Sequence, residues 1–205
     1  MTAVLYVVLV ALGVNAAQAL PRRSFGLVGG ALLWLAVAVP STVQLAAPGL
    51  LDALERDPDL IEDGELWRLL TSAFVQDGGV PGTLFNLTVL GVVVVTCGRV
   101  WGVARLWLLF LVGAVGCNLL DVAFLGSTGA GNSMATFTIA AATVALAVRR
   151  GDGRRAGVVR LVVLLAVGAI LLVARDHHGF SVLLGVPLGL VLSPVSRRSR
   201  TAAEG

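Results

Sequence analysis

Seven long apolar runs, separated by short polar segments, constrain this chain more than any other feature of its sequence. A helix needs about 20 apolar residues to cross the ~30 Å hydrocarbon core of a bilayer, and most of the runs approach that length. Only 13% of the residues are charged, whereas a soluble domain carries about a quarter. We therefore expect an all-α polytopic membrane protein. The expected helices cover residues 3–20, 25–47, 80–98, 104–125, 133–148, 157–174 and 178–195.

The basic residues fall in alternate loops, and all of them are Arg. If the N-terminus is outside, the cytoplasmic side holds 12 Arg and two acids, and the outer side holds three Arg and ten acids. This split follows the positive-inside rule, so we expect a multi-pass protein of the cell membrane with an outside N-terminus and a cytoplasmic C-terminus. The cytoplasmic arginines would be Arg22, Arg23, Arg99, Arg105, Arg149, Arg150, Arg154, Arg155, Arg160, Arg197, Arg198 and Arg200.

The composition gives little support to several other functions. The arginines lie in short clusters between apolar runs, so they form no basic face for nucleic acid, and we expect none as a partner. Cys97 and Cys117 lie in or beside apolar runs, which indicates neither a disulfide framework nor a metal site. We expect neither a metal nor an organic cofactor. We expect membrane lipids to surround the protein.

The charges and apolar runs also suggest how the chain is organised. We expect an N-terminal transmembrane helix with a basic connector (1–24), a six-helix core (25–195) with a long outer loop (48–78), and a cytoplasmic tail (196–205). A signal peptide is the alternative for the first run, because Ala17-Gln18-Ala19 resembles a cleavage site. That run has no basic segment before it, however, and cleavage would leave the following arginines outside, so we favour a retained helix.

Ser133 opens the short fifth run, directly after a Gly-rich segment. Sixteen residues, about 24 Å of helix, separate it from Arg149 at the expected cytoplasmic boundary, so Ser133 should lie below the outer surface. The irregular backbone before it is then tolerated only if it is buried in protein or lines a wet cavity. A simple helix N-cap at Asn132 or Ser133 is the alternative interpretation.

Three further polar sites lie where hydrocarbon is expected. His177-His178 opens the last run at a depth that matches Ser133 to within about one helical turn, although a histidine there could also be merely interfacial. Asn86 could donate a hydrogen bond to an oxyanion or bond to a neighbouring helix, and for Asn118 we expect only packing. Together these residues offer a nucleophile, a base and a donor, as acyl transfer requires.

These residues resemble the rhomboid family of intramembrane serine proteases in their order and spacing. The segment 67–74, WRLLTSAF, is similar to the family's WR-x-x-T-x-x-F pattern, and Asn86 follows it as the family's second-helix Asn does. Gly131-Asn132-Ser133 matches the G-x-S of the catalytic helix, with an aromatic Phe137 four residues on. The resemblance spans about residues 60–190.

The last helix carries a second part of the resemblance. His178, Ser181 and Gly185 resemble the pattern H-x-x-G-x-x-x-G with the first Gly replaced. Gly185 and Gly189 should let this helix pack closely on the serine helix. The resemblance implies a rhomboid-like six-helix bundle plus one extra N-terminal transmembrane helix. We interpret Trp67 and Arg68 as structural residues that fix the long loop at the membrane interface.

The implied activity is cleavage of transmembrane segments of other membrane proteins near the outer leaflet. Ser133 would be the nucleophile and His178 the base, acting as a dyad, since we find no acidic residue placed to orient the histidine. Asn86 would hold the oxyanion together with the backbone N–H of Ser133, and Asn132 and Gly131 would belong to the same binding region.

The chain also departs from the family pattern at three positions. Gly82 replaces a histidine that usually assists at the oxyanion site, Gln76 stands where another histidine is common, and Met134 replaces the Gly after the serine. These departures leave open an inactive rhomboid-like protein that binds transmembrane clients. A small transporter is a third alternative, but the sequence shows no paired repeat to support it.

Overall fold

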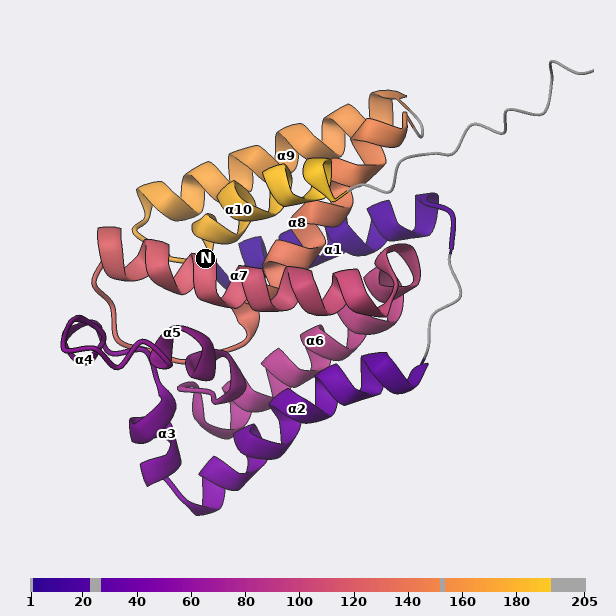
Figure 1. The fold of residues 1–205 in the computed structure, drawn as a ribbon. Coiled ribbons are helices and arrows are strands. Elements are labelled where there is room, and N and C mark those ends of the chain that lie inside the picture. Colours follow the sequence, from indigo (N-terminus) through magenta and orange to yellow (C-terminus); the bar gives the residue numbers. More distant parts are fainter. Residues whose placement is uncertain (1, 23–26, 152–153, 193–205) are drawn as a thin grey trace, which may run out of the picture.

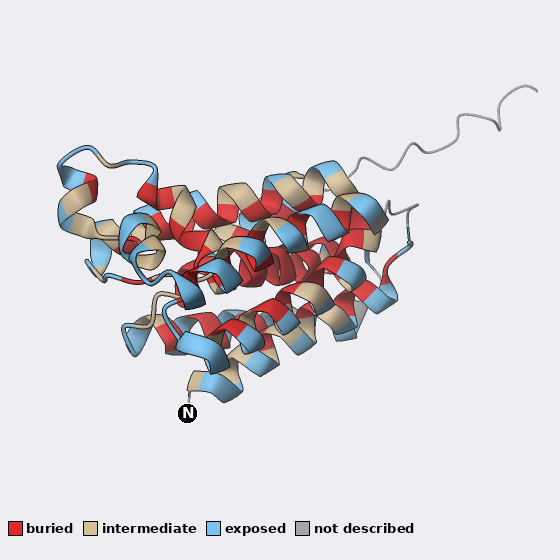
Figure 2. Cartoon of the chain, turned by 90° about the horizontal axis from the view of Figure 1, so that it is seen from below, coloured by how far each residue is buried: buried red, intermediate tan, exposed pale blue. Residues whose placement is uncertain are grey.

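The fold is built around α8 (Ser133–Arg150), a helix that is buried along most of its length. The computed structural model describes residues 2–22, 27–151 and 154–192. Every residue from Met134 to Ala147 is buried, and many of them are Ala or Thr. Figure 2 shows this continuous buried helix in the middle of the bundle. Because protein surrounds α8, its sequence need not be as apolar as that of a helix facing lipid.

Six long helices surround or support α8 (Figure 1). Helices α1, α6, α7, α9 and α10 contact α8 directly, and α2 packs mainly on α6. The bounds are α1 (Thr2–Ala19), α2 (Leu27–Ala46), α6 (Gly79–Trp101), α7 (Val103–Phe124), α9 (Arg154–Val173) and α10 (Gly179–Val191).

Each expected helix is found within a few residues of its expected bounds, which confirms the all-α polytopic class. By length and composition, five helices of the described chain could cross a membrane, namely α1, α2, α6, α7 and α9. Helix α10 is apolar but shorter. Its expected extension to residue 195 falls partly outside the described residues.

The long loop between α2 and α6 is folded into short helices at one end of the bundle (Figure 1). Asp57 begins one of them by accepting hydrogen bonds from the backbone N–H groups of Asp59 and Leu60. Arg68 bonds the carbonyl oxygens of Asp52 and Glu55, which supports its structural role. The elements are α3 (Gly49–Leu54), α4 (Pro58–Glu62), α5 (Arg68–Thr71) and the 3-10 helix η1 (Ser72–Phe74).

This loop is joined to the segment before α8 through Arg56. Its backbone pairs with Gly129, and its side chain bonds Ser127 and Asn118. Asn118 in turn donates to the carbonyl oxygen of Leu69, so the structure confirms the packing role expected for this residue. The segment that leads into Ser133 is therefore bonded to the loop at Ser127 and Gly129.

Helix α10 approaches α8 closely at two glycines. A Cβ atom at Gly185 would lie 2.7 Å from the carbonyl oxygen of Thr138, and one at Gly189 would lie 2.2 Å from that of Ala142. Any larger side chain would force the two helices apart. The close packing expected at these two glycines is confirmed.

Helix α1 also belongs to the bundle rather than standing apart from it. It packs on α8 and contacts α6 and α9 on either side. At Gly13 a Cβ atom would lie 2.6 Å from the Cβ of Ala140 on α8. The extra N-terminal helix therefore lies against the same helix that begins with Ser133.

The α6–α7 turn and the C-terminal end of α8 lie at the opposite end of the bundle from α3, α4 and α5 (Figure 1). Arg99 and Arg105 flank the α6–α7 turn, and Arg149 and Arg150 end α8. The spatial separation agrees with the expected charge split. Of the residues in that split, Arg23, Asp152, Arg197, Arg198, Arg200 and Glu204 lie outside the described residues, as does the tail 196–205.

Candidate active site

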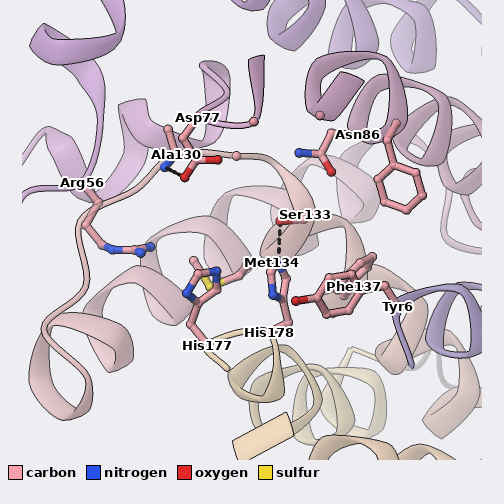
Figure 3. A pocket seen from close by; sticks show the side chains of 14 residues that line it. Tyr6, Arg56, Asp77, Asn86, Ala130, Ser133, Met134, Phe137, His177 and His178 are labelled. Atoms are coloured by element: carbon pink, nitrogen blue, oxygen red, sulfur yellow. Dashed lines mark hydrogen bonds between the residues drawn. The ribbon is translucent and has the colours of Figure 1, made fainter. Parts of the chain in front are cut away.

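Ser133 is the first residue of α8 and projects into a pocket at that end of the bundle (Figure 3). The first N–H groups of a helix have no partner inside the helix, so those of Ser133 and its neighbours point toward this pocket end. Asn132 occupies the N-cap position but makes no side-chain capping bond. Its side chain instead donates to the hydroxyl of Thr136, so simple capping does not explain this residue.

His178 lies at the start of α10, and its ring faces Ser133. The distance between Ser133 Oγ and His178 Nε2 is 2.8 Å. The imidazole packs against two aromatic rings, with centroid distances of 4.4 Å to Tyr6 and 5.3 Å to Phe137. The structure thus brings together the hydroxyl and the imidazole that the sequence predicted would meet.

An acidic residue orients the histidine, contrary to the prediction that none is placed to do so. Asp176 Oδ1 lies 2.7 Å from His178 Nδ1 and also accepts a hydrogen bond from the His178 backbone N–H. An ionised carboxylate can only accept, so Nδ1 carries the ring proton and Nε2 accepts from the Ser133 hydroxyl. The arrangement is a Ser-His-Asp triad rather than a dyad.

The protonation states of these groups follow from burial and hydrogen bonding. Burial alone would raise the pKa of Asp176, but hydrogen bonds from His178 and Tyr6 outweigh burial and hold this pKa well below its ordinary value. Burial lowers the pKa of His178 below its ordinary value, although the Asp176 carboxylate opposes that shift. At neutral pH the pair therefore consists of a carboxylate and a neutral imidazole.

The predicted oxyanion residues surround a small space beside Ser133. Gly131 has φ +154°, a backbone conformation that residues with a side chain rarely adopt. A Cβ atom there would lie 3.4 Å from Asn86 Nδ2 and 3.6 Å from Ser133 Oγ. The absence of a side chain at Gly131 leaves this space open between the serine and the amide.

A chain of amide groups holds Asn86 in place. Asn86 Nδ2 donates to Gln76 Oε1 over 2.7 Å, and Gln76 Nε2 donates to Asn132 Oδ1 over 2.9 Å. An amide nitrogen has two protons, so Asn86 keeps one donor beyond its bond to Gln76. The predicted residues Asn86 and Asn132 thus belong to one network, and Gln76 links them.

Gly82 and Met134, two of the three departures from the family pattern, both line the pocket. A Cβ atom at Gly82 would meet nothing within 4 Å, so the place of the missing histidine is open space. Met134 is buried.

The pocket has a volume of about 290 Å³ and two chemically different ends (Figure 3). Arg56, Asp77 and His177 line the polar end, and Tyr6 and Phe137 lie at the aromatic end beside His178. Both Ser133 and Asn86 face the space between the ends. A pocket of this size admits a short extended peptide segment rather than an intact helix, whose diameter is about 10 Å.

The neighbouring histidine makes a separate interaction. His177 Nδ1 lies 3.2 Å from Asp121 Oδ2, and the same carboxylate pairs with Arg56 over 3.3 Å. His177 therefore points toward the buried ionic network and His178 toward the serine. Of the two adjacent rings, that of His178 lies within hydrogen-bond distance of Ser133 Oγ.

The same loop contains a group of potential metal ligands. Within the described part of the chain, ligand atoms of Asp176, His177 and His178 lie within 4.8 Å of one another. Asp176 and His178 already bond each other, and His177 bonds Asp121. This geometry favours a hydrogen-bonded triad over a metal centre.

The sequence reasoning missed Asp176 and Tyr6 as parts of the site. Asp176 had a local signal, because an Asp side chain commonly accepts a hydrogen bond from the backbone N–H two residues further on, here that of His178 just before α10. Tyr6 had only its uniqueness, as the single Tyr of the chain, because no sequence pattern shows that α1 packs beside α8.

Comparison with known proteins identifies the family. The family model described as Rhomboid domain matches residues 63–199, well over half of the chain. No curated protein and no solved structure gives a significant match. The matched segment includes Ser133, His178 and Asp176 but neither α1 nor α2. The chain belongs to the rhomboid family.

Proposed function

We propose that this protein is an intramembrane serine protease that cleaves transmembrane segments of other membrane proteins. The observation that carries the proposal is the 2.8 Å contact between Ser133 Oγ and His178 Nε2, with Asp176 on the far side of the ring. A hydroxyl, a neutral imidazole and a carboxylate in this order form the arrangement that activates serine in acyl transfer.

The first chemical step would be proton transfer with nucleophilic attack. His178 Nε2 takes the proton of Ser133 as Oγ attacks the scissile carbonyl carbon, and Asp176 stays ionised and stabilises the imidazolium. The negative oxygen of the tetrahedral intermediate would accept hydrogen bonds from the Ser133 backbone N–H and the free proton of Asn86 Nδ2. Gly131 leaves the room for this oxygen.

The intermediate then collapses to an acyl-enzyme. His178 returns the proton to the leaving amine, and the new N-terminus departs with its part of the substrate. A water molecule next gives a proton to His178 and attacks the ester, and Ser133 is released with its proton restored. No group other than the residues of this chain, substrate and water takes part in these steps.

The pocket supports a locally unwound substrate. An intact helix hides its carbonyl groups in hydrogen bonds, so the cleaved segment must open before it reaches Ser133. Segments with Gly or Pro near the outer leaflet should be favoured, because these residues weaken helices by about 1 and 3 kcal/mol relative to Ala. In this proposal the N-terminus is outside the cell membrane and the C-terminus is cytoplasmic.

One structural feature favours a second function, binding of transmembrane clients without cleavage. The open space at Gly82 means that one oxyanion donor of the family is missing. In other serine proteases the loss of one such donor costs about 10²- to 10³-fold in rate. The intact triad supports cleavage at a reduced rate over pure binding.

Labelling with a fluorophosphonate tests the proposal, because this probe reacts only with an activated serine. The purified wild type should be labelled, and Ser133→Ala and His178→Ala should not. His177→Ala is the matched control, since this adjacent ring bonds Asp121 instead of the serine. Labelling that survives Ser133→Ala would refute the nucleophile, and an unlabelled wild type that binds clients tightly would favour the second function.

A further inference from the structure

Tyr6 of α1 reaches the far side of the triad. Its hydroxyl donates a hydrogen bond to Asp176 Oδ2 over 2.5 Å, across 170 positions of the sequence. Its ring lies 4.4 Å from the ring of His178 and 5.5 Å from that of Phe137, measured between centroids. Figure 3 shows the Tyr6 ring beside Phe137, with its hydroxyl directed toward the His178 side chain.

The two oxygens of Asp176 therefore have separate partners. Oδ1 accepts from the ring and the backbone of His178, and Oδ2 accepts from Tyr6. The Asp176 side chain is only 13% exposed, so little water is available to replace a lost donor. With a fixed partner on each oxygen, the carboxylate cannot rotate away from Nδ1.

The segment that carries Asp176 is short and needs this support. It connects α9 to α10, and within it Arg175 has a φ of 57°, a left-handed conformation that is unfavourable for residues with a side chain. Backbone hydrogen bonds from Arg175 and Asp176 to the end of α9 fix the backbone. Tyr6 is the described side chain from outside this segment that fixes the carboxylate.

Helix α1 is itself docked firmly enough to serve as a support. It lies between α6 and α9 against α8, where Gly13 allows close contact with Ala140. Leu9, one turn after Tyr6, is completely buried. The position of the Tyr6 hydroxyl is therefore determined by packing along the helix and not by a flexible end.

We propose that Tyr6 is a positioning residue of the active site, and that α1 completes the catalytic triad by holding Asp176 against His178. This inference rests on the proposed protease function and deepens it. The segment matched by the family model begins at residue 63, so Tyr6 lies outside that matched segment. The hydroxyl acts through Asp176, keeping the ring proton on Nδ1 and the lone pair of Nε2 toward Ser133.

Tyr6→Phe removes the hydroxyl and keeps the ring. We expect kcat for a transmembrane substrate to fall about 10- to 100-fold, as for the loss of a hydrogen bond to a charged group, with KM little changed. Without the donor, the full charge of Asp176 acts on the imidazolium, so the acidic limb of the pH–rate profile should move to higher pH. Val4→Ala, at an exposed position on the same helix, should leave the rate and the profile unchanged.

The contact itself can be measured without any activity. The chain has one Tyr, so uniform labelling with 3-fluorotyrosine gives a single ¹⁹F resonance that reports on Tyr6. Asp176→Asn should shift this resonance, and Asp63→Asn, an exposed carboxylate on the outer loop, should not.

The two readouts separate failure of this inference from failure of the proposed function. The role of Tyr6 would be overturned if Asp176→Asn left the ¹⁹F resonance of Tyr6 unshifted. It would also be overturned if Tyr6→Phe kept the wild-type kcat and pH profile. A faster Tyr6→Phe enzyme would overturn it too and would indicate that α1 obstructs the site. If Asp176→Asn shifts the Tyr6 resonance but the wild-type protein is not labelled by a fluorophosphonate, the contact stands and the protease function is refuted instead.

Discussion

The guanidinium of Arg56 and the carboxylate of Asp121 lie 3.3 Å apart, with their side chains only 2% and 0% exposed. Arg56 comes from the loop between α2 and α6 and Asp121 from the end of α7, so the pair joins two parts of the chain that are far apart in sequence. The same carboxylate accepts from His177 and Ser127. This network fixes the segment that leads into Ser133.

Arg56→Ala should therefore destabilise the fold and disorder the approach to the active site. The change leaves the buried Asp121 carboxylate without its guanidinium partner, and we expect a loss of about 3–5 kcal/mol in the free energy of unfolding. Thermal unfolding in detergent or bicelles measures the change. Arg155→Ala, at an exposed position on α9, is the control and should change stability by less than about 0.5 kcal/mol. Equal stability of the two variants would show that the Arg56–Asp121 ion pair does not stabilise the fold.

Gly189→Val should separate His178 from Ser133 by pushing α10 off α8. A Cβ atom at this position would lie 2.2 Å from the carbonyl oxygen of Ala142, far inside van der Waals contact. We expect loss of fluorophosphonate labelling and a lowered melting temperature. Gly49→Ala, where the added methyl group meets nothing within 4 Å, should keep both. Full labelling of Gly189→Val would contradict the close approach of the two helices.

The helices and the Ser133–His178 pair could be predicted from the sequence for physical reasons. Apolar runs long enough to cross a bilayer leave the backbone few alternatives to helix, so their bounds follow from hydropathy. The distances of Ser133 and His178 from the basic boundary of their runs set a common depth. The two glycines of the last helix indicated which helix pair would be in closest contact.

The remaining parts of the site depend on how helices pack sideways, which hydropathy does not determine. Tyr6 reaches Asp176 only because α1 packs on α8 between α6 and α9, and several arrangements of seven helices share the same spans. Asp176 was counted among the outer acids and not as a partner of its neighbour His178. From the sequence, Gln76 is only a residue that stands where the family often has a histidine. Its bonds to Asn86 and Asn132 depend on the three-dimensional packing.

Gly82→His should raise the rate of acylation, because it returns a donor to the oxyanion site. The position lines the pocket, and its Cβ would meet nothing within 4 Å, so an imidazole has room there. A gain of up to about 10²-fold in fluorophosphonate labelling rate is expected, in line with the value of one oxyanion donor. Gly82→Ala is the matched variant that adds a side chain without a donor. If Gly82→His reacts no faster than Gly82→Ala, the missing donor does not limit this enzyme.

The pH dependence of the reaction tests the coupling of Asp176 to His178. The reaction needs the neutral imidazole, and burial lowers the pKa of His178, so activity should fall only as the pH drops below about 6.5, the ordinary pKa of the side chain. The Asp176 carboxylate opposes this lowering, and Asp176→Asn should therefore move the acidic limb to still lower pH. It should also reduce the plateau rate by about 10²- to 10⁴-fold, because the asparagine no longer selects the Nδ1–H tautomer. Labelling rates between pH 4 and 9 measure both effects. An acidic limb that stays in place in Asp176→Asn would show that the carboxylate does not interact with the catalytic ring in the working enzyme.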